Sequence, residues 1–75
     1  MTVKEIVLAE EIGNEIYNAR IERGIRTQAI LAKRIGITRS YLNRIERGKY
    51  LPPVKMILKI AKVLNCEAKI KFVLQ

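Results

Sequence analysis

The chain has 75 residues, a net charge of +8, one cysteine and no histidine. These features exclude an internal disulfide and the usual Cys/His zinc site, and no stretch approaches the ~20 apolar residues of a membrane span. A chain of this size forms one small domain, here residues 1–75, and its low buried fraction favours association with a second copy. We expect a cytoplasmic protein without a metal or cofactor.

The positive charge is concentrated in the middle of the chain. The first 19 residues hold one lysine and four glutamates, whereas residues 20–50 hold nine lysines and arginines against two glutamates. Such an excess attracts phosphate polymers or anionic lipid at long range, although lysine-rich surfaces also serve solubility. Charge alone favours nucleic acid as a partner but does not establish it.

The first predicted element is a helix over residues 3–23. It opens on "TVKE" at residues 2–5, which has capping-box spacing, and Gly24 ends it. The apolar residues that recur at helical spacing, and are predicted to face the core, are Leu8, Ile12, Ile16 and Ala19. A short strand over residues 3–8 is the alternative, because the apolar residues of that stretch suit either state.

Two short helices separated by a three-residue turn are predicted next. Thr27 and Thr38 are good N-caps for helices over residues 28–35 and 39–47, and a glycine follows each helix. Two helices joined by a tight turn, the second of them basic, indicate a helix-turn-helix at residues 28–47.

The spacing of small and apolar residues supports a helix-turn-helix. Ala32 allows the two helices to approach closely, and Gly36 tolerates positive φ in the turn. Leu42 and Ile45 anchor the second helix, so that its opposite face is presented rigidly to solvent. One of these four residues could occur at its position by chance, but all four are not expected to do so within one basic segment.

A fourth helix follows in "LPPVKMILKIAKVLN". Pro53 suits its first position and Asn65 suits its end. The apolar face expected to pack in the core consists of Val54, Ile57, Leu58, Ala61 and Leu64.

From Cys66 the apolar residues alternate with polar ones, which predicts a β-strand over residues 66–74. A lone strand has no ladder partner, so we expect it to pair with the same strand of a second subunit, or otherwise with residues 3–8. The side chains expected in that dimer interface are Ile70, Phe72 and Leu74.

Residues 20–64 resemble the Cro/cI-type (Xre-like) helix-turn-helix proteins of bacteria and phages. The likeness lies in "TQAILAKRIGITRSYLNRIERGKYLPPVKMILKIAKVL", with a glutamine after the cap, the "RIERGK" ending and a "LLKIAKAL"-like fourth helix. One departure is "GIRTQ", which has a residue more between glycine and threonine than is common in the family. The resemblance implies a mostly α, four- to five-helix lambda-repressor-like bundle, to which the C-terminal strand is added.

The resemblance also implies how DNA is bound. In such proteins the second helix of the unit lies in the major groove, and the residues implied at the base edges are Arg39, Ser40, Asn43 and Arg44. An arginine donates twice to guanine and discriminates by roughly 1 to 3 kcal/mol against the wrong base, whereas Asn43 recognises adenine in a similar way or contacts a phosphate. The residues implied at the DNA backbone are Gln28, Tyr41, Arg47 and Lys49, and Thr38 is a further residue expected to bind DNA. Arg20 and Glu46 resemble another pairing of the family, a partly buried ion pair that connects the first helix with the end of the third.

We therefore expect a sequence-specific regulator that binds double-stranded DNA, a repressor that occupies an inverted-repeat operator as a homodimer and is nucleoid-associated when bound. One alternative is an antitoxin that binds a toxin protein and represses its own promoter, and another is a non-specific architectural DNA-binding protein. An enzyme is not expected, since the chain has no histidine, no glycine-rich phosphate loop and no nucleophile with an evident base.

Overall fold

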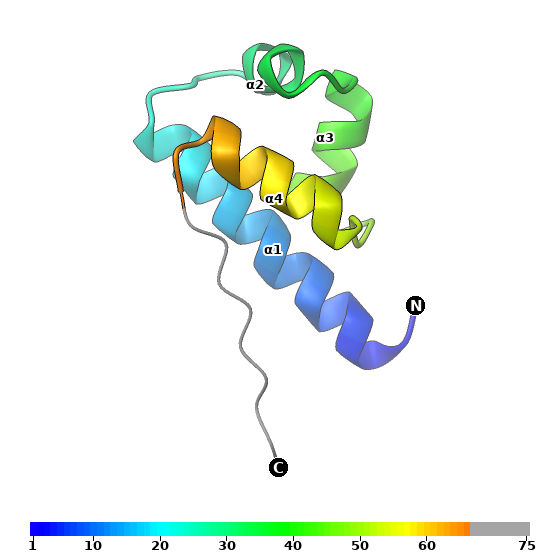
Figure 1. Ribbon diagram of the computed structural model, residues 1–75. Helices are drawn as coiled ribbons and strands as arrows, with labels where there is room; N and C mark the ends of the chain where they lie inside the picture. The colour runs from blue at the N-terminus through cyan, green and yellow to red at the C-terminus, as the bar shows by residue number, and fades with distance from the viewer. Residues whose placement is uncertain (67–75) are drawn as a thin grey trace.

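Four helices make up residues 1–66, the part of the chain that the computed structural model describes: α1 (Val3–Glu22), α2 (Gln28–Ile35), α3 (Arg39–Glu46) and α4 (Val54–Val63). α1 is the longest helix, and α2 and α3 lie at one end of the molecule, joined by a short turn (Figure 1). α3 packs against α1 and α2, and α2 also packs against α4. The predicted helix-turn-helix in a mostly helical fold is confirmed.

Side-chain caps determine where the first three helices begin. The Thr2 hydroxyl accepts from the Glu5 N–H at 3.2 Å, and the Glu5 carboxylate accepts from the Thr2 N–H at 2.9 Å, which completes a capping box. The Thr27 and Thr38 hydroxyls accept from the N–H groups three residues further on, at 3.2 and 3.0 Å. The alternative of a strand over residues 3–8 is wrong, because these residues form the first turns of α1.

The C-terminal β-strand in the predicted fold class is also wrong. Residues 1–66 form helices and connecting segments, and no strand occurs among them. Cys66, the first residue assigned to the strand, belongs to the C-terminal cap of α4 instead: Asn65 has a φ of +56°, and the Cys66 N–H donates to the Ala61 carbonyl at 2.9 Å. Alternation of apolar and polar residues does not by itself define a strand, since a strand also requires a ladder partner. Residues 67–74, including Ile70, Phe72 and Leu74, lie outside the described residues.

α1 buries most of the predicted face, but it is turned so that one end of that face is exposed. Ile16 is buried and Ile12 and Ala19 pack partly buried against the core, whereas Leu8 is 46% exposed. The other buried residues of α1 are Ala9, Gly13 and Arg20. α1 is in close contact with the end of α3: a Cβ atom on Gly13 would lie 2.5 Å from the backbone oxygen of Ile45. The close approach of two backbones at this glycine therefore helps to set the rotation of α1.

The predicted core face of α4 is correct only in part. Leu64 is buried as expected, whereas Val54 and Leu58 are each 53% exposed. Ile60, which was not predicted, is buried, and Met56 is partly buried. The sequence of α4 carries two apolar stripes, and the core covers only one of them. None of the helices within residues 1–66 is both long and apolar enough to span a membrane.

Arg23 joins the C-terminal ends of α1 and α4. Its Nε donates to the Leu64 carbonyl at 2.8 Å and its Nη2 to the Asn65 carbonyl at 3.1 Å. Carbonyls at a helix end lack partners within the helix, so this arginine supplies the donors that α4 itself does not provide.

Candidate nucleic-acid interface

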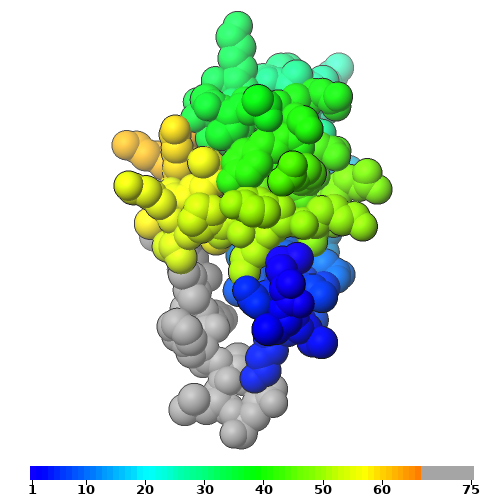
Figure 2. Space-filling view, turned by 90° about the vertical axis from the view of Figure 1, so that its right-hand side faces the viewer, coloured from blue at the N-terminus to red at the C-terminus, as the bar shows by residue number. Residues whose placement is uncertain are grey.

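α3 has one buried and one exposed side. Leu42 and Ile45 are fully buried and pack in the same core cluster as Leu31 and Ile60. The exposed side chains on α3 and directly after it are Arg39, Ser40, Arg44 and Arg47. Figure 2 faces this side of the molecule, with α3 in green at its centre and the residues that follow in yellow-green below. α3 is thus a firmly anchored helix with a basic outer surface.

The turn between α2 and α3 fixes the angle of α3. Gly36 ends α2 with φ of +89°, and its N–H donates to the Ala32 carbonyl at 2.8 Å. The N–H of Ile37 donates to the same carbonyl at 3.0 Å. Because the left-handed region is costly for residues with a Cβ atom, glycine is the residue that allows this turn.

Arg44 lies beside a pair of aromatic rings. Its guanidinium carbon is 5.8 Å from the centroid of the Tyr50 ring, and that ring lies 5.4 Å from the Tyr41 ring at an angle of 55°. A cation–π contact of this kind stabilises by about 0.5 to 1 kcal/mol at an exposed site, and it restricts the guanidinium. The pKa of Tyr41 is raised above its ordinary value, first by partial burial and then by the Tyr50 side chain. Tyr50 was not predicted as a site residue, and no spacing rule marks it.

Arg20 and Glu46 form an ion pair inside the protein. The Nε and Nη2 atoms of Arg20 donate to the two Glu46 carboxylate oxygens at 2.8 and 3.1 Å, and the two side chains are 5% and 2% exposed. The remaining terminal nitrogen, Nη1, donates to the carbonyls of Ile25 and Arg26, both at 3.0 Å. This pair connects α1 with the end of α3 and with the segment that leads into α2.

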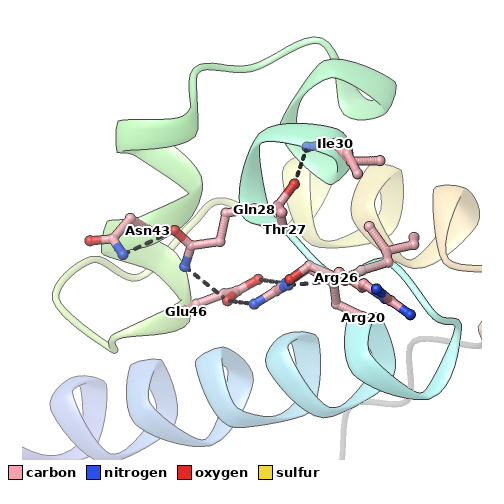
Figure 3. A network of polar contacts seen from close by, with 8 residues as sticks. Arg20, Arg26, Thr27, Gln28, Ile30, Asn43 and Glu46 are labelled. Atoms are coloured by element: carbon pink, nitrogen blue, oxygen red, sulfur yellow. Dashed lines mark hydrogen bonds and ion pairs between the residues drawn. The ribbon is translucent and has the colours of Figure 1, made fainter.

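A chain of amide contacts extends from the ion pair to the surface of α3. Gln28 Nε2 donates to Glu46 Oε1 at 3.0 Å, and Asn43 Nδ2 donates to Gln28 Oε1 at 3.1 Å (Figure 3). Within the described part of the chain, every buried side-chain nitrogen and oxygen has a hydrogen-bond partner. The Gln28 side chain thus faces inward, which leaves mainly the backbone N–H groups at the start of α2 for the predicted phosphate contact. The residues joined by these two hydrogen bonds are 18 and 15 positions apart in the sequence, so sequence spacing could not reveal the contacts.

The structure brings most of the sequence-predicted DNA-binding residues onto one helix. The residues along α3 or at its two ends are Thr38, Arg39, Ser40, Tyr41, Asn43, Arg44, Arg47 and Lys49. Gln28 lies at the start of α2 and contacts this group through Asn43. The arrangement can place several cations and one amide along a single groove of a nucleic acid.

The comparison with known protein families agrees with this geometry. A family model described as helix-turn-helix matches residues 16–70. The chain belongs to this Cro/cI-type helix-turn-helix family. Members of the family are DNA-binding regulators of transcription.

Similar proteins come from a phage and from archaea. The ImmF control region 10 kDa protein of Bacillus phage phi105 is 34% identical over 61 residues, which cover 81% of this chain and 67% of that protein. An uncharacterized HTH-type transcriptional regulator of Archaeoglobus fulgidus is 43% identical over 47 residues, or 63% of this chain and 66% of that protein. One of Methanocaldococcus jannaschii is 40% identical over 47 residues, or 63% of this chain and 71% of that protein. The matches thus span about two thirds of these relatives. No solved structure matches the chain.

Proposed function

We propose that this helix-turn-helix protein is a sequence-specific, double-stranded DNA-binding repressor of transcription. The observation that carries the proposal is the basic outer side of α3, held in place by two fully buried residues, Leu42 and Ile45. A helix of ~10 to 12 Å diameter fits the major groove, which is ~12 Å wide. The names of the relatives, a phage control region protein and transcriptional regulators, also fit this role.

The residues of α3 divide by their chemistry. Arg39 and Arg44 offer forked donors suited to guanine O6 and N7, and the stacking of Arg44 on Tyr50 restricts its direction. Arg47 and Lys49 at the end of the helix suit phosphate contacts, which fix the register of the protein on DNA without recognising sequence. Affinity should therefore fall steeply with salt, whereas base preference should depend on the arginines of α3.

The test is a selection from randomised duplex DNA at fixed salt, followed by mobility shifts on the selected site. We expect Arg39→Ala and Arg44→Ala each to relax the preference at one base position by about 5- to 150-fold. Lys62→Ala, which removes one exposed positive charge from α4, is the matched control and should leave the preference unchanged. If neither arginine variant alters base preference, the assigned recognition surface is wrong.

We further propose that the protein acts as a homodimer on an inverted repeat. A single recognition helix buries too little surface for tight specific binding, whereas two of them ~34 Å apart meet successive half-sites on one DNA face. The exposed Val54 and Leu58 on α4, one helical turn apart, supply apolar area that association would cover.

Sedimentation of the full chain over a concentration series tests the homodimer, together with binding to one half-site and to the repeat. Two chains bound per repeat, with much weaker binding to the isolated half-site, are expected. A monomer at high concentration that binds both DNAs equally well contradicts the dimer.

A further inference from the structure

We propose that the buried Arg20–Glu46 pair sets the direction of the Asn43 amide through Gln28, and thereby makes Asn43 select adenine over guanine. This inference rests on the proposed function, because it assigns a base preference to a residue of the DNA-facing helix. Gln28 and Glu46 are positioning residues in this arrangement, since they act through Asn43.

The chain of contacts has one direction, and the carboxylate determines it. A carboxylate has only acceptor atoms, and both oxygens of Glu46 already accept from Arg20. Gln28 must therefore turn its NH₂ group toward Glu46, from which it lies 3.0 Å, because its oxygen would face another acceptor there. The Gln28 oxygen then faces Asn43.

The Gln28 oxygen in turn determines the orientation of the Asn43 amide. Asparagine and glutamine amides carry an oxygen and a nitrogen of similar shape, so their hydrogen-bond partners decide which way they point. Asn43 meets the Gln28 oxygen at 3.1 Å and must present its NH₂ group to it. Figure 3 shows the result, with the Asn43 oxygen pointing away from Gln28. The outward groups of Asn43 are thus this oxygen and the second N–H.

This outward pair of groups matches adenine. In the major groove adenine offers the N6 amino donor beside the N7 acceptor, which an asparagine can meet with its oxygen and an N–H. Guanine offers two acceptors, O6 and N7, and would place one of them against the Asn43 oxygen. Asn43 lies one helical turn after Arg39 on α3, so the two side chains would meet neighbouring bases.

Gln28→Met tests the proposal because it removes the middle contact and leaves the ion pair intact. Both hydrogen bonds from Arg20 to Glu46 remain in this variant, and an unchanged urea midpoint would show that the fold is kept. Without the Gln28 oxygen the Asn43 amide can turn over. We expect the preference for adenine over guanine at the position facing Asn43 to fall at least about fivefold in Gln28→Met.

The same substitution in an Asn43→Ala background separates positioning from direct contact. If Gln28 acts through Asn43, Gln28→Met should cause no further change in base preference once Asn43 is alanine. A phosphate contact by Gln28 would instead lower the affinity for all sequences equally and leave the preference unchanged. The proposal is overturned if Gln28→Met leaves the preference unchanged, or if its effect on preference persists in Asn43→Ala.

Side-chain amide resonances of the free protein provide a test that needs no DNA. The two Nδ2 hydrogens of Asn43 should have well-separated shifts in the wild type and should move toward those of an exposed asparagine in Gln28→Met. Unchanged shifts overturn the positioning step even if DNA binding is specific. By contrast, a wild-type chain that binds all sequences alike, with Arg39→Ala and Arg44→Ala without effect on preference, overturns the proposed function together with the base preference of Asn43.

Discussion

Replacing Arg20 by methionine removes a charge that is nearly inaccessible to solvent and leaves its partner behind. The Glu46 carboxylate would keep a single side-chain donor, Gln28 Nε2 at 3.0 Å, and its side chain is only 2% exposed. The carbonyls of Ile25 and Arg26 would also lose the Nη1 donor that they share. Methionine retains an unbranched chain of similar volume, so the loss is mainly electrostatic.

The expected cost follows from the burial of the pair. Breaking a buried ion pair by removing one partner costs about 3 to 5 kcal/mol, because an uncompensated charge remains inside. Native domains are stable by about 5 to 15 kcal/mol, so Arg20→Met should remove a large share of the free energy of unfolding. With a urea dependence of about 1 to 3 kcal/mol per molar, the midpoint should fall by at least about 1 M.

Urea unfolding of four chains measures the cost and identifies its cause. Arg26→Met is the matched control, since the Arg26 side chain is exposed and only its carbonyl contacts Arg20. Arg20→Met combined with Glu46→Leu removes both charges and should be more stable than Arg20→Met alone, because apolar replacement of a whole buried pair is often neutral. A loss below about 1 kcal/mol in Arg20→Met, or a double variant less stable than the single one, contradicts an uncompensated buried Glu46 charge as the cause of the loss.

Three further predictions concern packing, capping and pH. Gly13→Ala should destabilise by about 1 to 3 kcal/mol despite the higher helix propensity of alanine, because its Cβ would meet the Ile45 backbone oxygen; a gain in thermal stability contradicts this close approach. Arg23→Ala should cost about 1 kcal/mol and speed amide hydrogen exchange at the end of α4, where the Leu64 carbonyl loses the Arg23 Nε donor and keeps only the weak Cys66 thiol donor; unchanged exchange there contradicts the capping role. The raised pKa of Tyr41 contributes stability that is complete below pH 10.0 and is lost as pH rises through the raised value. Tyr41→Phe should therefore be less sensitive to alkaline unfolding than the wild type, and equal sensitivity contradicts this assignment.

The beginnings of the first three helices could be predicted because their signals are local. Thr2, Thr27 and Thr38 each accept from an N–H three residues later, and this contact depends only on neighbouring residues. The spacing of Ala32 and Leu42 within the helix-turn-helix was informative for a similar reason, since the two helices are joined by a short turn. Contacts could thus be predicted from the sequence where the interacting groups belong to the same helix or to the same pair of neighbouring helices.

The rotation of α1 and α4 could be predicted only in part. Leu8 and Leu58 belong to regular apolar stripes and are nevertheless 46% and 53% exposed. A glycine inside a helix was the available signal for α1, because such a residue often marks close packing, but its partner at Ile45 lies on another helix. The prediction of a C-terminal strand had a related weakness, since the alternation of apolar and polar residues does not show whether a ladder partner exists.

The polar contacts around α3 allow stability and base preference to be separated. Leu42 and Ile45 hold α3 by apolar packing, whereas the next residue, Glu46, holds it through charge and through the amides of Gln28 and Asn43. If the ion pair served stability alone, replacing both charges by apolar residues would leave binding intact. If the pair also directs Asn43, the variant with Arg20→Met and Glu46→Leu should fold nearly as well as the wild type and yet lose preference for adenine over guanine, because no acceptor remains to orient Gln28. The ion pair would then be required at this site less for the strength of the fold than for fixing one of two nearly equivalent amide orientations on the DNA-facing surface.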